Sequence, residues 1–269
     1  MPLVHRDHHF LHYQTLGDPK NPPLLLIMGL ALSSRGWDRL PELLARHFHV
    51  LVFDNRGTGQ SARTGRAYRM RDLAGDAAAV IEAAGLPSAH VFGISMGGMI
   101  AQELALQYPE RVRSLALGCT YASWRKSVAP GLRAKLDLLL LNLGHVKAKV
   151  IGRLLVSREW HEKNPRAALE WLRRAEHTTL RFALAQLLAV ARHHALPRLA
   201  QIRAPTLVIT GGGDRLIPPR NSEVLAQLIP GARLVVLPGA GHCFPLEREE
   251  ETVRALRDHF LSSHLMRAG

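Results

Sequence analysis

The sequence predicts an α/β protein in which a mostly parallel sheet is flanked by helices. Strand-like apolar runs alternate with helix-like segments along most of the chain, and this alternation is typical of parallel sheets. Several of the strand-like runs end directly in glycine-rich loops. A chain of 269 residues with 47% hydrophobic side chains is long enough for one large domain that carries an insertion.

Local patterns place the elements in chain order. Two short strands come first, and the turn residues at 17–19 separate them from a third, fully apolar strand. Val80 and Ala84 continue a spacing of four that indicates a helix at 70–85. The expected strands cover 3–5, 10–15, 24–27, 49–53, 89–92, 112–117, 204–210 and 233–237. The expected helices outside the insertion cover 37–47, 70–85, 99–108, 218–228 and 245–265.

A serine stands at a strand-to-helix junction in residues 93–98, Gly-Ile-Ser-Met-Gly-Gly. In that context the pattern predicts a nucleophile elbow, whose tight turn needs the small residues Gly93 and Gly97. Ser95 is then the candidate nucleophile, and the N–H of Met96 points at the same place from a helix N-terminus. The alternative is a glycine-rich turn with a solvated serine.

Two later segments place a carboxylate and an imidazole in comparable loops. Asp214 follows the strand-like run 204–210 and three glycines, and His242 follows the run 233–237. A weak serine nucleophile needs a base to take its proton and a third group to orient that base. The order Ser, Asp, His, each on a loop after a strand, is that of the α/β hydrolases, and the chain resembles this family over nearly its whole length. The resemblance implies a catalytic triad of Ser95, Asp214 and His242.

The same resemblance implies an oxyanion-hole loop after the third strand. Residues 23–30 fit that place, although this chain has Met28-Gly29 where the family often has His-Gly. The expected donors are the backbone N–H groups of Leu30 and Met96. Because a backbone donor does not depend on its side chain, the departure at Met28 is expected to leave the hole intact.

The segment 53–61 looks like the family's loop after the fourth strand. Its glycines permit a tight turn, and Asp54 and Arg56 are expected to pair or to cap backbone groups. Asp54 precedes the serine and follows a different strand, so it is not the expected triad acid.

The positive charge is concentrated in one region. Residues 122–199 contain 15 Lys/Arg and five Asp/Glu, and so carry +10 of the net charge of +13. The divide falls where the family inserts its lid, which predicts a core domain at 1–120 and 200–269 and a helical cap at 121–199. Apolar residues recur at helical spacing from Leu132 to Leu143 and from Leu169 to Val190. Pro165 and Pro197 are expected to mark helix ends.

Three interpretations of the basic cap remain open: a solvated surface, steering of anionic substrates, and attachment to an acidic membrane surface. Nucleic-acid binding is disfavoured, because aromatic residues make up only 6% of the chain and no zinc-finger spacing occurs. No metal site is expected, since the adjacent pair His193-His194 lacks the i, i+4 spacing of helical ligands. With only Cys119 and Cys243, no disulfide framework is implied.

The sequence contains no apolar run of about 18 residues, so no membrane span is expected. The first residues lack an apolar signal core, which favours a cytoplasmic protein. The oligomeric state cannot be read from the sequence.

The resemblance is closest to small esterases and enol-lactone hydrolases with a helical cap, and it implies hydrolysis of carboxylic esters or lactones without a cofactor. Other activities of the same triad stay open: cleavage of activated C–C bonds, release of N-terminal proline, and peracid formation. A ligand receptor with little turnover is the alternative from another class. The candidates for substrate contacts are Met28, Gly29, Trp124 and Phe244.

Overall fold

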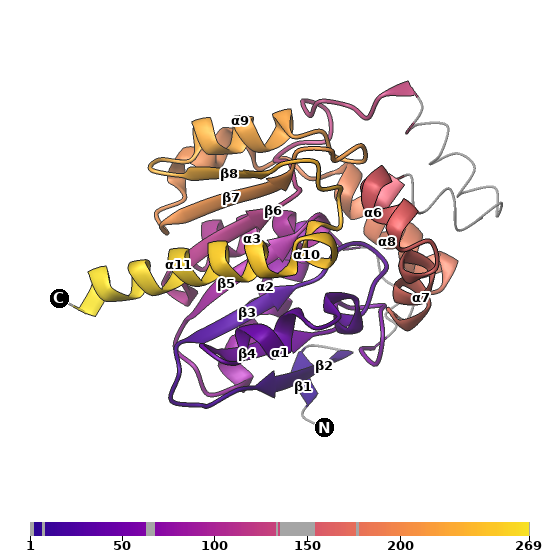
Figure 1. Ribbon diagram of the computed structural model, residues 1–269. Helices are drawn as coiled ribbons and strands as arrows, with labels where there is room; N and C mark the ends of the chain where they lie inside the picture. Colours follow the sequence, from indigo (N-terminus) through magenta and orange to yellow (C-terminus); the bar gives the residue numbers. More distant parts are fainter. Residues whose placement is uncertain are drawn as a thin grey trace.

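The computed structural model describes residues 3–6, 9–62, 68–132, 134, 154–175 and 178–268. The strands are β1 (Leu3–Arg6), β2 (His9–Leu16), β3 (Pro23–Ile27), β4 (His49–Phe53), β5 (Ala89–Ile94), β6 (Val112–Gly118), β7 (Thr206–Gly211) and β8 (Arg233–Leu237). In this part of the chain they form one sheet in the order β1-β2-β4-β3-β5-β6-β7-β8 (Figure 1). The pairs β1–β2 and β2–β4 are antiparallel, and all pairs from β4 to β8 are parallel. The predicted α/β architecture with a mostly parallel sheet is confirmed.

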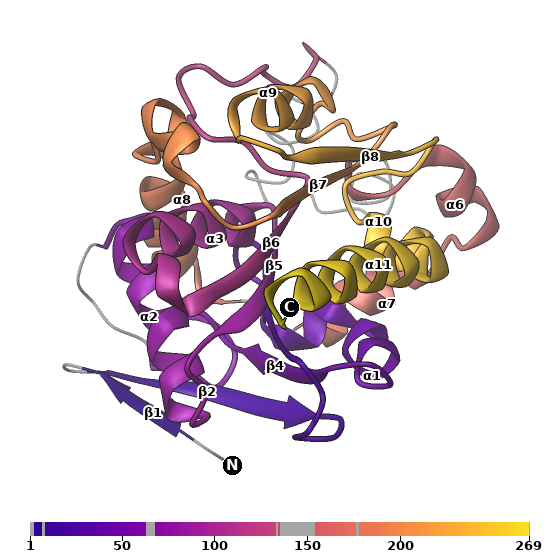
Figure 2. The same cartoon turned by 90° about the vertical axis from the view of Figure 1, so that its left-hand side faces the viewer.

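Helices cover both faces of this sheet. The α-helices described in the core are α1 (Leu40–Leu44), α2 (Met70–Ala83), α3 (Met96–Gln107), α9 (Arg220–Leu228), α10 (Phe244–Glu247) and α11 (Glu249–Ala268). The short 3-10 helices are η1 (Ser34–Trp37), η2 (Pro109–Arg111) and η3 (Leu196–Gln201). Figure 2 shows α1 and α11 on one side of the sheet and α2 and α3 on the other. Side chains of α9 pack into the same apolar cluster as those of α2 and α3.

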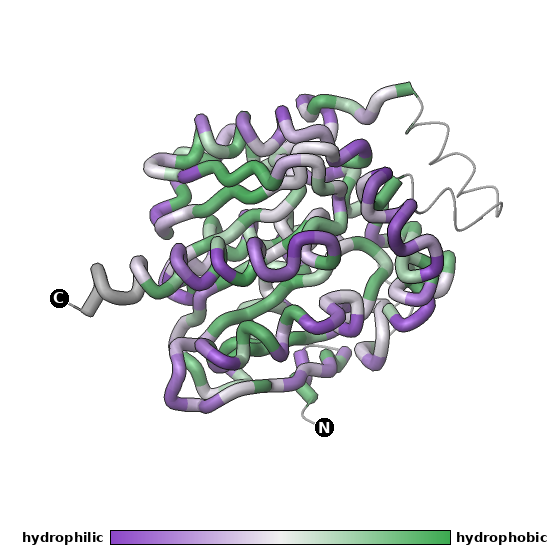
Figure 3. Tube along the Cα trace, in the orientation of Figure 1, coloured by the Kyte–Doolittle hydropathy of each residue, from purple (hydrophilic) through white to green (hydrophobic). Residues whose placement is uncertain are grey.

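The core lies in two apolar clusters, one on each face of the sheet. β3 is buried at every position, and its side chains alternate between the clusters: Leu25 and Ile27 join the one under α2 and α3, and Leu24 and Leu26 the one under α1 and α11. A strand covered on both faces is apolar throughout, and the central strands accordingly form the hydrophobic middle of the molecule (Figure 3).

Two expected helices differ from the structure. Instead of one helix at 37–47, the chain forms η1 and the short α1, in which Pro41 occupies the first turn. Proline fits only there, because it lacks the N–H that a helix interior needs. The expected closing helix is divided into α10 and α11 by Arg248, whose φ of −131° and ψ of 54° are not helical.

A helical insertion separates β6 from β7. Its described helices are α6 (Arg158–Lys163), α7 (Ala167–Arg174) and α8 (Leu180–Ala191), which Figure 1 shows at one end of the sheet. Its two ends meet, because the carbonyl of Ala122 accepts hydrogen bonds from the N–H groups of Ala195 at 2.7 Å and Leu196 at 3.3 Å. Pro165 lies between α6 and α7, and Pro197 in the first turn of η3. The helical spacing from Leu136 to Leu143 lies outside the described residues.

Candidate active site

Ser95 lies where β5 ends and α3 begins. Its φ of 56° and ψ of −121° form a backbone conformation that costs a non-glycine residue about 1–3 kcal/mol. Its N–H donates to the carbonyl of Gly118 at 2.8 Å, and its carbonyl accepts from Oγ1 of Thr120 at 2.7 Å. Both peptide groups of the strained residue are therefore held in place by the end of β6 and the loop that follows it.

The glycines on either side of Ser95 are required by close backbone approach. A Cβ on Gly93 would lie 2.2 Å from the carbonyl oxygen of Gly97, and a Cβ on Gly97 would lie 2.0 Å from that of Ile27. Neither position can accept a side chain, which is the steric reason for this motif. Met96 is the first residue of α3, so its N–H has no acceptor within the helix and lies at the positive end of the helix dipole.

Asp214 and His242 lie in the loops after β7 and β8, and both are buried. Nδ1 of His242 is 2.8 Å from Oδ2 of Asp214. The other carboxylate oxygen accepts from the N–H groups of Leu216 and Ile217, both at 2.8 Å. An ionised carboxylate only accepts, so Nδ1 carries the ring proton and Nε2 remains available as a base.

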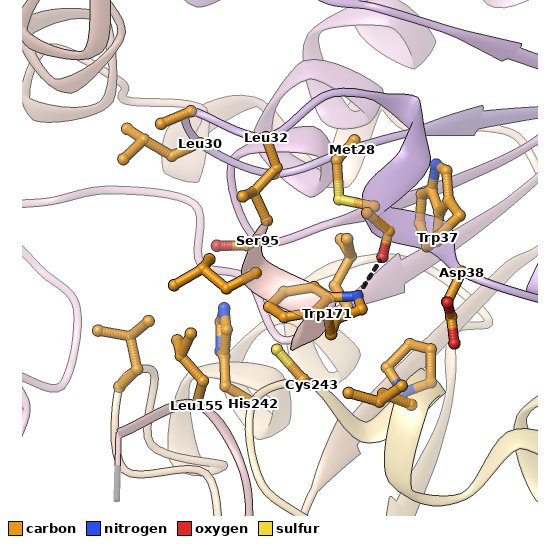
Figure 4. A pocket seen from close by; sticks show the side chains of 18 of the residues that line it. Met28, Leu30, Leu32, Trp37, Asp38, Ser95, Leu155, Trp171, His242 and Cys243 are labelled. Carbon is orange, nitrogen blue, oxygen red and sulfur yellow. Dashed lines mark hydrogen bonds between the residues drawn. The ribbon is translucent and has the colours of Figure 1, made fainter. Parts of the chain in front are cut away.

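Ser95 and His242 line the same cavity, which has a volume of about 490 Å³ (Figure 4). Met28, Gly29 and Leu30, in the loop after β3, line it as well. A Cβ on Gly29 would lie 3.3 Å from Cβ and 3.8 Å from Oγ of Ser95, so this loop passes next to the serine. The structure thus brings the loops after β3, β5 and β8 together at one cavity, with Asp214 behind His242.

The rest of the cavity wall is mostly apolar and comes partly from the insertion, which contributes Leu154, Leu155, Trp171 and Leu172. The indole N–H of Trp171 donates to the carbonyl of Gly36 at 2.9 Å and so joins the insertion to the core (Figure 4). Asp38 is the one carboxylate in the described wall, and Arg174 lies 3.2 Å from it. Sequence reasoning missed Trp171, although its place beside Leu172 in an amphipathic helix was a usable signal.

Two predicted contact residues lie outside this cavity. Phe244 is fully buried and packs against Gly118 under the sheet, because α10 turns its ring inward and leaves Pro245 and Leu246 facing the cavity. Trp124 is 52% exposed and its ring contacts Tyr121 rather than the cavity wall. The positions expected for Phe244 and Trp124 are therefore corrected.

One group of three donor side chains in the described residues is compact enough to hold a metal ion: Cys119, Asp214 and His242, whose donor atoms lie within 4.8 Å of one another. Two of these three side chains already bond to each other. Nδ1 of His242 bonds the carboxylate, and burial raises the pKa of the Cys119 thiol well above its usual value, so the thiol stays protonated. Burial also raises the pKa of Cys243, which lines the cavity as a neutral thiol. Both cysteines are free.

Asp54 and Arg56 support the neighbouring loops. The carboxylate of Asp54 accepts from the N–H of Ser34 at 2.7 Å and from that of Gln60 at 2.9 Å. Arg56 does not pair with Asp54; it makes two bonds of 2.6 Å to the carboxylate of Asp76 in α2.

The insertion is also bonded to the loop that carries His242. Glu247 in α10 accepts from the N–H of Gly241 at 2.8 Å and, with its other oxygen, from that of Ser157 at 3.0 Å. The N–H of Cys243 donates to the carbonyl of Leu155 at 2.7 Å. The position of the His242 loop therefore depends on contacts with the insertion.

The family model described as "alpha/beta hydrolase fold" matches residues 22–249, which is most of the chain. The chain belongs to the α/β hydrolase family. This confirms the resemblance inferred from the three motifs, and with it that the chain is a hydrolase.

Named relatives of this hydrolase span nearly its whole length. The rhodomycin D methylesterase DauP of Streptomyces sp. (strain C5) is 32% identical, over 96% of this chain and 97% of that protein. A putative carbamate hydrolase, RutD, of Azorhizobium caulinodans is 30% identical, over 91% and 92%. The crystal structure of the enol-lactonase from Burkholderia xenovorans LB400 superposes with a TM-score of 0.85 at 26% identity, covering 97% of this chain and 100% of that one.

No helix in the described residues of this hydrolase has the length and apolar character needed to cross a membrane.

Proposed function

We propose that this hydrolase cleaves carboxylic esters or lactones through an acyl-enzyme formed on Ser95. His242 acts as general base and then as general acid, and Asp214 fixes its tautomer. The observation that carries the proposal is the shared cavity: a strained serine and an imidazole already bonded to a buried carboxylate both line it. Relatives that are named a methylesterase and an enol-lactonase support the reaction class.

The proposed reaction has two halves. In the first, Oγ of Ser95 attacks the acyl carbonyl while Nε2 of His242 takes the hydroxyl proton, and the N–H groups of Leu30 and Met96 stabilise the oxyanion. The tetrahedral adduct then expels the alkoxide oxygen, which receives the proton from His242. In the second half, His242 activates a water that attacks the acyl-enzyme, and the carboxylic acid leaves with Ser95 regenerated.

We further propose that the preferred substrates carry an apolar group next to the scissile bond. The cavity of about 490 Å³ is large enough for a medium-length acyl chain, and its wall is mostly aliphatic and aromatic. Each buried methylene contributes about 0.8 kcal/mol. Residues 121–199 then act as the cap, since four of their side chains close one side of the cavity.

Burst-phase hydrolysis of p-nitrophenyl esters from acetate to octanoate tests this proposal. We expect turnover by the wild type with kcat/KM rising with chain length until the cavity is full. Ser95→Ala should lower kcat by roughly 10⁴-fold or more. The control Ser262→Ala removes an exposed hydroxyl in α11 and should retain full activity.

A parallel assay with an enol-lactone of similar size separates lactone from ester preference. Turnover that survives Ser95→Ala would refute the acyl-enzyme. If no ester or lactone is cleaved but a diketone is, the C–C hydrolase alternative replaces this one.

A further inference from the structure

The loop after β3 is attached to the insertion at two residues. Ser33 donates its N–H at 3.0 Å and its hydroxyl at 2.7 Å to the carbonyl of Ala175, and Ala31 makes the contacts beside the proposed oxyanion donor. Ala31, with φ of 63°, follows Leu30 directly. Its N–H donates to Oε1 of Gln186 at 2.7 Å, and its carbonyl accepts from the N–H of Thr178 at 3.3 Å. Gln186 and Thr178 both belong to the insertion, so the peptide groups on either side of Ala31 are held by the insertion.

Gln186 is well suited to hold this loop. It lies in the middle of α8 and is fully buried. Its Oε1 is occupied by the N–H of Ala31, and its Nε2 donates to the carbonyl of Arg56 at 3.2 Å. The single side chain therefore joins the loops after β3 and β4. A buried amide left without such partners destabilises a protein by about 1–3 kcal/mol. The hydrogen-bonded position of the Gln186 side chain is therefore favoured over one in which its amide has no partners.

The bond from Ala31 restricts the peptide that follows the proposed donor. The N–H of Ala31 and the carbonyl of Leu30 lie in one rigid peptide plane, so the bond to Gln186 fixes that plane. On the other side, Nδ2 of Asn55 donates to the carbonyl of Met28 at 3.0 Å, which fixes the preceding peptide plane. The Gly29–Leu30 peptide, whose N–H is the proposed donor, lies between these two anchored planes. Gly29 would otherwise leave this segment the freest part of the loop.

We propose that Gln186 is a positioning residue for catalysis: from the insertion, it holds the N–H of Leu30 in the direction that an oxyanion requires. This inference rests on the proposed function. Gln186 lies outside the described cavity wall, so it acts through Ala31 and not on the substrate. Its removal should therefore weaken binding of the transition state and leave binding of the substrate ground state nearly unchanged.

The experiment measures kcat and KM for the best p-nitrophenyl ester with Gln186→Met and Gln186→Glu. Methionine keeps the volume and removes both hydrogen bonds, and should lower kcat roughly 10- to 100-fold with KM within about twofold. Glutamate keeps an acceptor for the N–H of Ala31 and should recover most of kcat. A trifluoromethyl ketone, which forms an oxyanion adduct with Ser95, should lose affinity in Gln186→Met by the same factor as kcat/KM.

Gln102→Met is the matched control. Gln102 is also a fully buried helical glutamine, and its Nε2 donates to the carbonyl of Tyr121 at 3.2 Å, away from the loop after β3. It should lower the free energy of unfolding as Gln186→Met does and leave kcat and ketone affinity unchanged. If Gln186→Met does not fold, Gln186→Asn takes its place, because asparagine keeps the amide and is one methylene too short to reach Ala31.

Three outcomes overturn the inference: full kcat in Gln186→Met, equal loss in the glutamate and methionine variants, or equal loss in the Gln102 control. Failure of the proposed function looks different, because then the wild type is inactive or Ser95→Ala stays active.

Discussion

At the scale of single residues, hydrogen bonds hold the carboxylate of Asp214 and the backbone of Ser95 in place. Three donors hold the carboxylate of Asp214: two backbone N–H groups and the ring of His242. Ser95 is held through both of its peptide groups. Preorganised groups of this kind need little rearrangement when charge develops in the transition state.

Asp214→Asn tests the role of the carboxylate. Asparagine can offer its NH₂ group to Nδ1 of His242, which favours the wrong tautomer and removes the charge that stabilises the imidazolium. We expect kcat to fall roughly 10²- to 10⁴-fold with a much smaller change in KM, measured with the same esters. An unchanged rate would mean that another carboxylate supports His242.

The positions of the proposed triad residues could be predicted from the sequence, because each stands in a local strand–loop pattern that needs no knowledge of the rest of the chain. Trp171 and Gln186 could not be found in this way. The helical pattern around Trp171 signals a buried face, but it does not name the partner. Tertiary packing brings the polar atoms of Trp171 and Gln186 to backbone groups more than 100 positions away. Trp124 and Phe244 were misplaced for the same reason, since aromatic character alone does not tell a core ring from a pocket ring.

At the scale of elements, α2 is bound to the N-terminal strands through one buried carboxylate. Asp76 accepts from Arg6 at 3.0 Å and from His9 at 3.2 Å, in addition to its two bonds with Arg56. Burial alone would raise its pKa, but the bonds from His9 and Arg56 outweigh burial and leave the pKa below the usual value. The ionised form therefore stabilises the fold.

Asp76→Asn should lower the free energy of unfolding at pH 7 by about 3–5 kcal/mol, because it leaves the partly buried guanidinium groups of Arg6 and Arg56 without a counter-charge. The folded-state pKa is lowered, so the contribution is fully present above the unfolded value of about 3.9 and is lost as the pH falls through the folded value. Urea denaturation at pH 7 and below pH 4 should show the gap between wild type and variant closing in acid.

The control is Asp258→Asn, which breaks an exposed pair with Arg257 at 2.8 Å. An exposed pair contributes about 0–1 kcal/mol, so this variant should unfold almost like the wild type. Equal losses in the two variants would contradict the role assigned to Asp76.

Most strands could be predicted to within one or two residues, because a strand buried on both faces is an unbroken apolar run. The helices were harder. The segment 37–47 has helical composition, but Pro41 limits it to one short turn after η1. The break at Arg248 carries no proline or glycine signal. The local sequence therefore does not predict it.

At the scale of the whole molecule, two buried histidines make stability depend on pH. Burial lowers the pKa of His193 to about 4 and that of His259 to about 4. Glu103 and Arg198 face His193, and the carbonyl of Leu115 accepts from Nε2 of His259. Both rings are therefore neutral in the folded protein at pH 7.

The free energy of unfolding should fall between pH 6.5 and about 4, where the unfolded chain binds protons that the folded chain does not. Each of the two histidines adds a slope of up to about 1.4 kcal/mol per pH unit in that window, and above pH 6.5 the contribution is fully present. His259→Gln should reduce the slope, as measured by urea midpoints across the window. The exposed His5→Gln should not.

The cavity itself could not be predicted, because its wall combines loops of the core with helices of the insertion. The concentration of positive charge, by contrast, was readable, and part of it is compensated. Arg174 lies 3.2 Å from Asp38 and Arg198 lies 2.5 Å from Glu103, so insertion cations pair with core carboxylates. Sequence showed which region is basic, and only the fold shows where its partners lie.

The meeting of the two ends of the insertion at Ala122 and Ala195 has a consequence for exchanging parts between proteins. Segments whose ends are adjacent can be replaced with little strain on the remaining chain. A chimera that joined this core to a foreign cap at these positions should keep its sheet. Its loops after β3 and β8 would lack their hydrogen bonds to the insertion, unless the foreign cap supplied groups equivalent to the N–H of Ser157 and the amide of Gln186. An exchange of caps that aims to transfer substrate preference should therefore keep these two hydrogen-bonding positions as well as the residues of the cavity wall.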